Sequence, residues 1–396
     1  MSRYTLTPAR AFGAALAAAV TVGLLSAPAV AQSAEASATA DSRYAALQKY
    51  IEDQVEKGGV PGIIASVQDG RHTWQGDAGV ADLRTGEERG DDDRFRVGSI
   101  TKTFVATVIL QLEAEGRLDL DDTVEKWLPG LVEGNGHDGG AVSVRQLLNH
   151  TSGISSYTGN TEFLHTYVAG EGFLKNRYHR HSPESLVGWA MRKAPDFAPG
   201  TGWSYSNTNY ILAGLIIEKA TGTSYEQQVE NRILRPLALK NTSLPRDSAD
   251  MPRPSGRAYS KLFSEDPAAK VHDATRLNAS WGWAAGDMIS TTGDLHRFIG
   301  ALMSGKLLPP QQQKELTTTV STPVPGARYG LGVSHQVLSC GAEVWGHNGG
   351  IHGSLSDMFA TKDGRRSLAM NANGDWNNNS SDNPQGGLKA VFCDKK

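Results

Sequence analysis

Residues 94–112 read RFRVGSITKTFVATVILQL, and the spacing of the apolar side chains changes within this stretch. From Ser99 onward the apolar residues recur every three or four positions, so that Phe104, Val108 and Leu112 fall on one stripe. The stretch therefore predicts an amphipathic helix that begins at Ser99.

Strand patterns lie on both sides of a helix-rich middle. Alternation predicts strands at 63–68, 71–76, 330–337, 343–346, 355–361 and 367–371. Helical spacing predicts helices at 44–55, 143–148, 183–193, 209–220, 225–234, 292–302 and 388–392. The order indicates the α/β (α+β) class: one α/β domain built from residues 42–95 and 285–396, with a helical domain, residues 96–284, inserted into it.

The first 31 residues have the pattern of a signal peptide. Arg3 and Arg10 precede a short apolar run, and Ala29-Val30-Ala31 is a small-x-small cleavage site. An uncleaved anchor is the alternative, and residues 32–41 are expected to be a mobile leader. We therefore expect a secreted, extracellular protein without stable membrane insertion, and a monomer. A formal charge of −3 gives no basic excess for nucleic acid.

Two cysteines, Cys340 and Cys393, are present in the chain. An oxidising compartment permits one disulfide between them, and two buried thiols are the alternative. Two cysteines exclude a metal site made of four thiolates. His347 and His352 lack an H-E-x-x-H motif and a matching carboxylate, so we expect no metal and no cofactor.

Ser99-Ile100-Thr101-Lys102 is the only S-x-x-K in the chain. Residues three apart share one face of a helix, so the Lys102 amine can reach the Ser99 hydroxyl. A neutral amine there would accept the proton of an otherwise weak nucleophile. A serine-capped helix with a surface lysine gives the same letters, so the motif alone does not establish a nucleophile.

Tyr205-Ser206-Asn207 is the only Y-x-N, and it lies in a loop that leads into an apolar helix. A phenol relays protons when a cation such as Lys102 lowers its pKa. The Asn207 amide would donate to a substrate carbonyl or contact the lysine. The alternative is an ordinary helix cap.

His347-Asn348-Gly349-Gly350 lies on or beside a late strand. A glycine lets a substrate backbone lie against the strand edge. The N–H groups of Gly350 and Ser99 are then candidates for an oxyanion hole. G-x-S-x-G is absent, which excludes the nucleophile elbow of α/β-hydrolases. The order S-x-x-K, Y-x-N, H-x-G is more specific than any one part and indicates a serine acyl-transferring hydrolase.

With these motifs the sequence resembles the serine β-lactamase and penicillin-binding superfamily, especially the secreted D-alanyl-D-alanine carboxypeptidase of Streptomyces type and its class C relatives. The resemblance covers nearly the whole chain after the signal peptide. Further matching segments are 147–153 (LLNHTSG), 205–209 (YSNTN), 329–332 (YGLG), 338–341 (LSCG) and 392–393 (FC). The last two favour a Cys340–Cys393 bridge.

The resemblance implies an antiparallel sheet flanked by terminal helices, and an acyl-enzyme on Ser99. It implies that Lys102 and Tyr205 share general base and acid duty, and that His347 polarises the tyrosine network. Asn207, Trp281, Asn348, Gly349 and Gly350 would contact the substrate, although Trp281 as a core residue is the alternative. The expected partners are D-amino-acid peptides or amides, with β-lactams as inhibitors.

One position departs from the carboxypeptidase pattern. An arginine that grips the substrate's carboxylate stands two residues after the Y-G-L-G segment in that family, and here the position is Ser334, followed by His335. A bidentate charged contact is lost. Arg177 or Arg180 in the stretch 157–181 would be a replacement.

Four functions remain. A penicillin-sensitive D-alanyl-D-alanine carboxypeptidase is the first hypothesis. A D-stereospecific amidohydrolase, esterase or endopeptidase is the second, because it needs no free carboxylate. A β-lactamase is the third, and a non-catalytic penicillin or peptidoglycan sensor is the fourth. An intact set of Ser99, Lys102 and Tyr205 disfavours the sensor.

Overall fold

The computed structural model describes residues 43–264, 266–376 and 385–393, which belong to one compact unit. The predicted signal peptide (1–31) and leader (32–41) lie outside the described residues. Within the described part of the chain, no helix combines the length and apolar character needed to cross a membrane.

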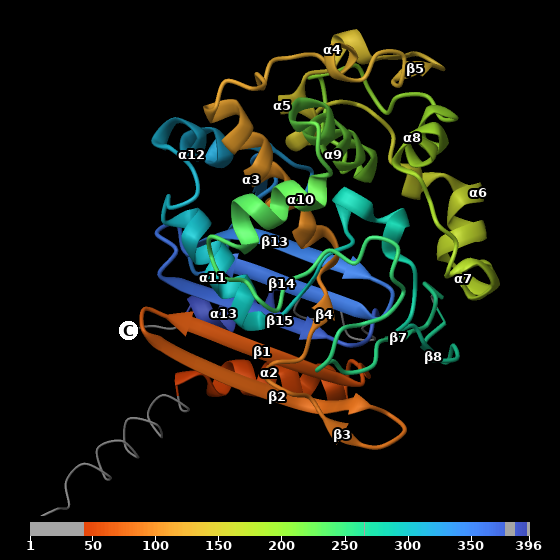
Figure 1. Cartoon of the computed structure of the whole chain (residues 1–396). Helices are drawn as coiled ribbons and strands as arrows, with labels where there is room; N and C mark the ends of the chain where they lie inside the picture. Colours follow the sequence, from red (N-terminus) through yellow and green to blue (C-terminus); the bar gives the residue numbers. More distant parts are fainter. Residues whose placement is uncertain (1–42, 265, 377–384, 394–396) are drawn as a thin grey trace, which may run out of the picture. The chain divides into compact units, whose positions relative to one another are not determined.

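A mixed strand-and-helix fold with a large antiparallel sheet is observed, as the sequence predicts (Figure 1). In the described residues its order is β10-β11-β12-β13-β14-β15-β1-β2-β3. The strands are β1 (Gly62–Asp69), β2 (His72–Asp82), β3 (Glu87–Glu88), β10 (Val320–Ser321), β11 (Ala327–Tyr329), β12 (Ser334–Val337), β13 (Glu343–Ile351), β14 (Ser354–Ala360) and β15 (Arg366–Ala372). Strands from the two ends of the chain meet where β1 pairs with β15, with Ala65 opposite Met370.

Helices cover both faces of the sheet. Most of them come from the middle of the sequence. They are α2 (Ala45–Glu56), α3 (Thr101–Ala114), α4 (Val124–Trp127), α5 (Val144–Leu148), α6 (Thr161–Phe163), α7 (Gly170–Asn176), α8 (Pro183–Met191), α9 (Asn207–Thr221), α10 (Tyr225–Val229), α11 (Thr292–Met303), α12 (Pro310–Thr317) and α13 (Gly386–Phe392). Short pairs β4 (Phe95–Arg96) with β9 (Ile289–Ser290), β5 (Glu133–Gly134) with β6 (His137–Asp138), and β7 (Tyr259–Ser260) with β8 (His272–Asp273) complete the description. The division into an α/β domain and a helical domain stays a prediction.

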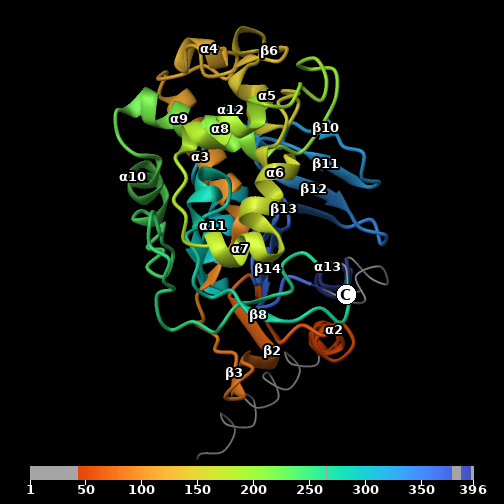
Figure 2. The same ribbon diagram turned by 90° about the vertical axis from the view of Figure 1, so that its right-hand side faces the viewer.

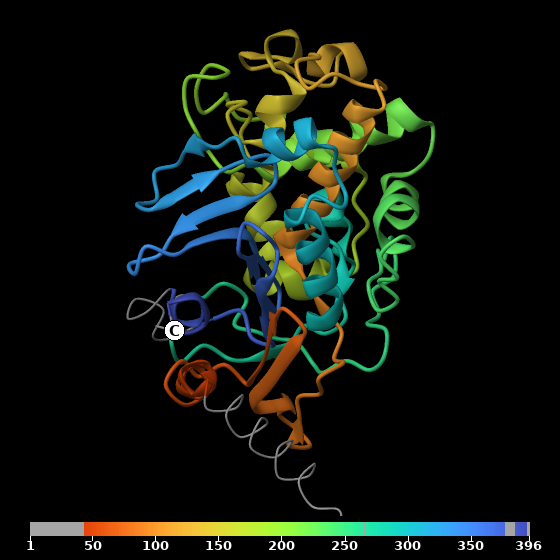
Figure 3. The ribbon, with the colours of Figure 1, turned by 90° about the vertical axis from the view of Figure 1, so that its left-hand side faces the viewer.

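Successive side chains of each strand point to opposite faces of the sheet, and each face has its own apolar core. On the outer face, helices α2 and α13 lie side by side and cover residues such as Val67 and Leu368 (Figure 3). On the inner face, α3 and α11 pack through Phe104 and Phe298, whose stacked ring centroids lie 3.6 Å apart. Figure 2 shows α2 and α11 on opposite sides of the sheet. Helix α3, which follows Ser99, is thus enclosed, and its residues 101–110 are all buried.

Several predicted boundaries are wrong. The helix begins at Thr101, because Gly98–Ile100 forms a 3-10 turn before it. The strand predicted at 330–337 begins only at Ser334, because residues 330–333 form a turn in which the Gly330 N–H bonds to the Val333 carbonyl. The strand predicted at 343–346 continues to Ile351. The motif His347–Gly350 therefore lies inside a strand.

Candidate active site

Ser99 lies in the 3-10 turn Gly98–Ile100, directly against strand β13. A Cβ on Gly349 would lie 1.9 Å from the Val97 carbonyl oxygen and 2.9 Å from the Ser99 nitrogen. Gly98 has φ +51°, and a Cβ there would lie 2.7 Å from the Gly350 nitrogen. The two backbones approach this closely only because both positions are glycine. The predicted oxyanion pair, the N–H groups of Ser99 and Gly350, thus belongs to two segments in contact.

Lys102 stands one helical turn after Ser99 and is fully buried. Its Nζ lies 3.0 Å from Ser99 Oγ, 2.8 Å from Asn207 Oδ1 and 2.6 Å from the Ala285 carbonyl oxygen. Burial lowers the pKa of the amine well below its ordinary value, because a charge is poorly solvated there. The structure thus brings together the serine and lysine of the first motif and the asparagine of the second.

The three contacts of Lys102 match a neutral amine. A neutral amine has two N–H groups and one lone pair, while the Asn207 and Ala285 oxygens can only accept hydrogen bonds. The two N–H groups therefore go to these two oxygens. The lone pair is left for the Ser99 hydroxyl, which can donate its proton. This is the arrangement that a general base requires.

Asn207 is the first residue of α9, and two hydrogen bonds orient its side chain and its backbone. Its Nδ2 donates to Thr158 Oγ1 at 3.0 Å, and its backbone N–H donates to Ser156 Oγ at 3.2 Å. Oδ1 is thereby turned toward Lys102. Of the two contacts predicted for Asn207, the structure contains the one with the lysine; contact with a substrate stays a prediction.

Tyr205 presents its ring to the lysine, with Nζ 5.0 Å from the ring centroid. Its hydroxyl is buried and has no hydrogen-bond partner of good geometry among the described residues. Burial raises the pKa of the phenol, and the nearby Ser99 hydroxyl opposes this shift. Tyr205 is therefore a neutral phenol, which can donate a proton; the expected lowering of its pKa by a cation is not found.

His347 is buried and faces Tyr329 rather than Ser99 or Lys102. Its Nδ1 contacts the Asn348 carbonyl oxygen and its Nε2 lies 2.8 Å from the Tyr329 hydroxyl. Because the carbonyl only accepts, Nδ1 carries the proton and Tyr329 donates to Nε2. Burial lowers the pKa of His347 to about 3. The imidazole is neutral, and its centroid lies 6.1 Å from that of Tyr205.

The edge of β13 beside these residues is open. Strand β12 pairs with β13 only from Glu343 to Gly346, whereas β14 pairs along β13 as far as Ile351. Asn348 is exposed on the outer face, and Gly349 and Gly350 follow it. In the described part of the chain no strand covers this edge beyond Gly346, so an extended peptide can add there as a further strand.

Trp281 lies at the end of a 3-10 turn, Ala279–Trp281, that precedes the lysine-binding Ala285. The Tyr157 hydroxyl donates to its carbonyl oxygen. The Trp281 ring is half-buried, with its centroid 5.7 Å from that of His352. The structure thus gives it a partly open position against the core that contains the residues of α3; contact with substrate stays a prediction.

Four contributors to this site were not predicted. Tyr329, Ala285 and Thr158 hold His347, Lys102 and Asn207, respectively. His150 packs its ring 4.3 Å from that of Tyr205 and accepts from the Ser206 N–H. Tyr329 and His150 stand in segments that carry the family resemblance, which was the available signal. Ala285 and Thr158 contribute a backbone carbonyl and a common hydroxyl, which carry no motif.

Neither Arg177 nor Arg180 replaces the arginine of the carboxypeptidase pattern. Ser334 pairs with Gly346 at the start of β12. Arg177 donates to the carbonyl oxygens of Asp273 and Arg276. Arg180 pairs with Asp247. Both arginines are engaged within their own surface region.

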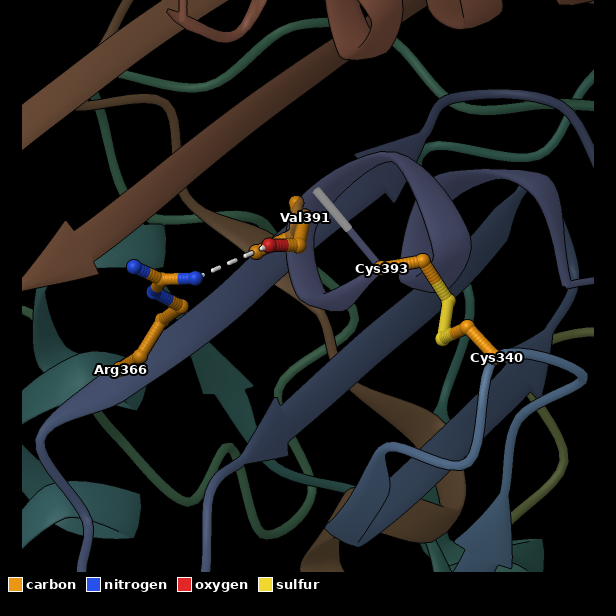
Figure 4. The surroundings of a disulfide bond; sticks show 4 residues. All are labelled: Cys340, Arg366, Val391 and Cys393. Atoms are coloured by element: carbon orange, nitrogen blue, oxygen red, sulfur yellow. Dashed lines mark hydrogen bonds between the residues drawn. A yellow bond between two sulfur atoms is a disulfide. The ribbon is translucent and has the colours of Figure 1, made fainter. Parts of the chain in front are cut away.

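Cys340 and Cys393 form the disulfide (Figure 4). It ties the turn after β12 to the end of α13, and the alternative of two thiols is therefore wrong. Beside it, Arg366 of β15 donates to the Val391 carbonyl of α13 at 3.5 Å. Among the described residues there is no group of three or more histidine, cysteine or acidic side chains that could hold a metal ion.

The chain is similar to known proteins in sequence and in structure. Residues 47–387 match the family described as Beta-lactamase. The chain therefore belongs to the beta-lactamase family, and it is a serine hydrolase of the beta-lactamase and penicillin-binding type.

Two solved structures are similar to this chain over most of its length. A D-stereospecific amidohydrolase from Streptomyces sp. is 53% identical, with a TM-score of 0.83 over 89% of this chain and 99% of that one. The D-amino acid amidase from Ochrobactrum anthropi SV3, complexed with L-phenylalanine amide, is 28% identical, with a TM-score of 0.72 over 84% and 91%.

A curated relative is more distant. Penicillin-binding protein 4* of Bacillus subtilis is 27% identical over 336 residues, 83% of this chain and 71% of that protein. The chain spans less than two thirds of the length of other curated relatives from Bacillus and Staphylococcus.

Proposed function

We propose that this protein is a D-stereospecific amidohydrolase that cleaves uncharged D-aminoacyl amides and esters through an acyl-enzyme on Ser99. The observation that carries the proposal is Ser334, which stands where a carboxylate-binding arginine is expected. An enzyme without that cation loses the bidentate contact that selects substrates with a free C-terminal carboxylate. The likeness to the Streptomyces amidohydrolase supports the same substrate class.

Acylation would use the neutral Lys102 amine as the base. As Ser99 Oγ attacks the substrate carbonyl, its proton moves to Nζ across the 3.0 Å hydrogen bond. The negative charge on the carbonyl oxygen would be stabilised by the N–H groups of Ser99 and Gly350. The new ammonium is stabilised by the oxygens of Asn207 and Ala285.

Tyr205 would act as the acid. Its buried phenol keeps its proton and can deliver it to the leaving nitrogen, since an amide anion is too basic to depart unprotonated. The phenol is then reprotonated from the Lys102 ammonium, so that the amine is neutral again. In deacylation a water molecule takes the place of the leaving group, attacks the acyl carbon and loses its proton to the same base. The bond between the acyl carbon and Ser99 Oγ then breaks, and the Lys102 ammonium returns the proton to Ser99.

The remaining expectations belong to the same proposal. β-Lactams are expected to acylate Ser99, because their strained amide uses the same nucleophile and oxyanion site. The protein is expected to be exported after cleavage at Ala31 and to act as a monomer. A D-alanyl-D-alanine carboxypeptidase is the competing function that the first experiment separates.

The experiment compares hydrolysis of D-phenylalanine amide, L-phenylalanine amide and a blocked tripeptide that ends in D-Ala-D-Ala. We expect the D-amide to have the highest kcat/KM. Faster release of D-alanine from the peptide would overturn the proposal in favour of the carboxypeptidase. Ser99→Ala should abolish all turnover and all covalent labelling by penicillin.

A gain-of-function variant tests the role of position 334. Ser334→Arg should raise kcat/KM for the carboxylate-ended peptide about tenfold or more, as expected for one charged hydrogen-bonding contact, and leave the D-amide little changed. Ser339→Arg adds the same charge at an exposed turn and is the matched control. Equal responses of the two variants would show that the effect comes from net charge.

A further inference from the structure

A cavity of about 210 Å³ opens on the outer face of the sheet, beside the unpaired edge of β13. Its floor is made by side chains of four neighbouring strands, and α2 forms a wall. Its lining residues are Tyr50, Gln54, Val60, Ile63, Asn348, Gly349, Leu355, Ser356, Asp357, Met370, Ala372 and Trp376. The same strand, β13, therefore lines this cavity and carries the candidate oxyanion group.

The register of the strands determines which cavity residues lie next to the unpaired edge of β13. Asn348 lies opposite Asp357, and Asp357 lies opposite Met370, so these three form one row across the outer face. The next row runs from Gly350 through Leu355 to Ala372. Because alternate side chains of an added strand point to opposite faces, a peptide along the β13 edge would direct every second side chain toward these rows.

Asp357 is the acidic side chain of this cavity, and it is a carboxylate at neutral pH because burial raises its pKa only to about 6. No lysine, arginine or histidine is among the lining residues, and no side-chain hydrogen bond or ion pair joins the Asp357 carboxyl group to another described residue. The neighbouring Tyr50 hydroxyl is neutral, since burial raises its pKa to about 12. A carboxylate in partly apolar surroundings without a cation is unfavourable unless a partner arrives.

The remaining walls suit an alkyl chain. Val60, Ile63, Leu355, Met370 and Ala372 supply apolar surface on both sides of Asp357. An engineered apolar cavity of about 150 Å³ accommodates benzene, so this volume is sufficient for a chain of about four carbons with a terminal amine. The cavity thus combines a negative group with apolar walls.

We propose that this cavity is a substrate subsite for an alkylammonium group, which pairs with Asp357 while the substrate backbone lies on the β13 edge. The inference rests on the proposed function, since it assigns a further substrate contact to the same enzyme. Two sources supply this chemistry: an ammonium on the side chain of the D-aminoacyl residue, and an ammonium on the amine that leaves.

The experiment uses two substrate pairs that differ in one terminal ammonium. D-Lysine amide against D-norleucine amide tests the acyl side, and the N-(4-aminobutyl) amide of D-norleucine against its N-butyl amide tests the leaving side. We expect kcat/KM to be at least about tenfold higher for the charged member of one pair, as for a hydrogen bond between charged groups. Asp357→Asn should reduce that ratio to near one.

Asp92→Asn is the matched control, because it removes one exposed acidic charge away from the cavity lining. It should leave both ratios unchanged. Ratios within twofold of one for both pairs in the wild type would overturn the subsite, as would a preference that survives in Asp357→Asn. Failure of the proposed function looks different: none of the four amides would be hydrolysed. Thermal unfolding of Asp357→Asn checks that the variant is folded.

Discussion

The hydroxyl of Tyr329 lies 2.8 Å from Nε2 of His347, and both side chains are buried. This contact, together with the Asn348 carbonyl at Nδ1, assigns the imidazole a single neutral tautomer. His347 thus contacts Tyr329 and its own strand, and Lys102 makes the direct contact with Ser99.

The first prediction concerns this tautomer. Nitrogen NMR of His347 should show a proton on Nδ1 and none on Nε2 from pH 5 to pH 8, because burial lowers its pKa to about 3. Tyr329→Phe should leave Nε2 without a donor and lower the free energy of unfolding by about 1–3 kcal/mol. An imidazolium at pH 7, or a proton on Nε2, would contradict the assignment.

The second prediction tests the approach of β13 to the serine turn. Gly349→Ala places a methyl group 1.9 Å from the Val97 carbonyl oxygen, so one backbone must move. We expect kcat to fall at least about a hundredfold, the scale of losing one oxyanion donor. Gly188→Ala in α8 is the control, since nothing lies within 4 Å of its new methyl group. Near-normal turnover by Gly349→Ala would remove this segment from the oxyanion site.

How far the sequence predicts this site depends on the kind of signal each residue carries. Ser99, Lys102 and Asn207 belong to short motifs, and the structure brings them within hydrogen-bond distance. The Ala285 carbonyl contributes a backbone atom that any residue could supply, so no pattern of letters reveals it.

The fold, like the site, is predicted in part by the sequence. The long strands and helices follow from apolar periodicity, whereas the late start of β12 depends on tertiary contacts. The turn at 330–333 is tied to α3 by the Thr103 hydroxyl, which donates to the Gly332 carbonyl at 2.8 Å. Periodicity alone predicts a strand through this turn, because Thr103, which binds the turn, lies 229 residues away in sequence.

The third prediction is a loss of stability in acid. Burial lowers the pKa of five histidines: to about 3 for His347, to about 4 for three, and well below normal for one; they are His150, His181, His296, His347 and His352. Unfolded, these groups take up protons below about pH 6.5, so stability falls as pH decreases from there toward 4. Each contributes up to about 1.4 kcal/mol per pH unit.

Two buried carboxyl groups act in the opposite direction. Burial raises the pKa of Asp287 to about 8 and of Asp357 to about 6, so at pH 5 the folded state holds protons that the unfolded state releases. Burial also raises the pKa of Asp77, Glu218 and Asp375, but the five histidines and the buried Lys102 amine outnumber the five carboxyl groups, so unfolding at pH 5 should take up protons on balance. Calorimetry in buffers of different ionisation enthalpy measures this uptake. Net proton release at pH 5 would contradict the prediction.

The fourth prediction concerns the disulfide between Cys340 and Cys393, which are 53 residues apart. In the chain-entropy account, a loop of this size stabilises the fold by about 4 kcal/mol. The double variant Cys340→Ser with Cys393→Ser should be less stable by about that amount and keep its activity on D-phenylalanine amide. Two titratable thiols in the purified wild type would show that the bond is absent in solution.

The last prediction separates the acid role of Tyr205 from a positioning role. Tyr205→Phe should lower kcat for D-phenylalanine amide roughly a hundredfold or more, because the leaving nitrogen must be protonated. A p-nitrophenyl ester of the same acid has a leaving group that departs as an anion, so its acylation should fall much less.

Tyr210→Phe is the matched control for this comparison. Tyr210 also lies beside the lysine, with Nζ 5.6 Å from its ring centroid, but its hydroxyl donates to the Leu148 carbonyl at 2.8 Å. Its loss should cost stability and leave the amide-to-ester ratio unchanged. If Tyr205→Phe lowers amide and ester turnover equally, the phenol positions Ser99 or Lys102 instead of donating a proton, and the acid must be the Lys102 ammonium.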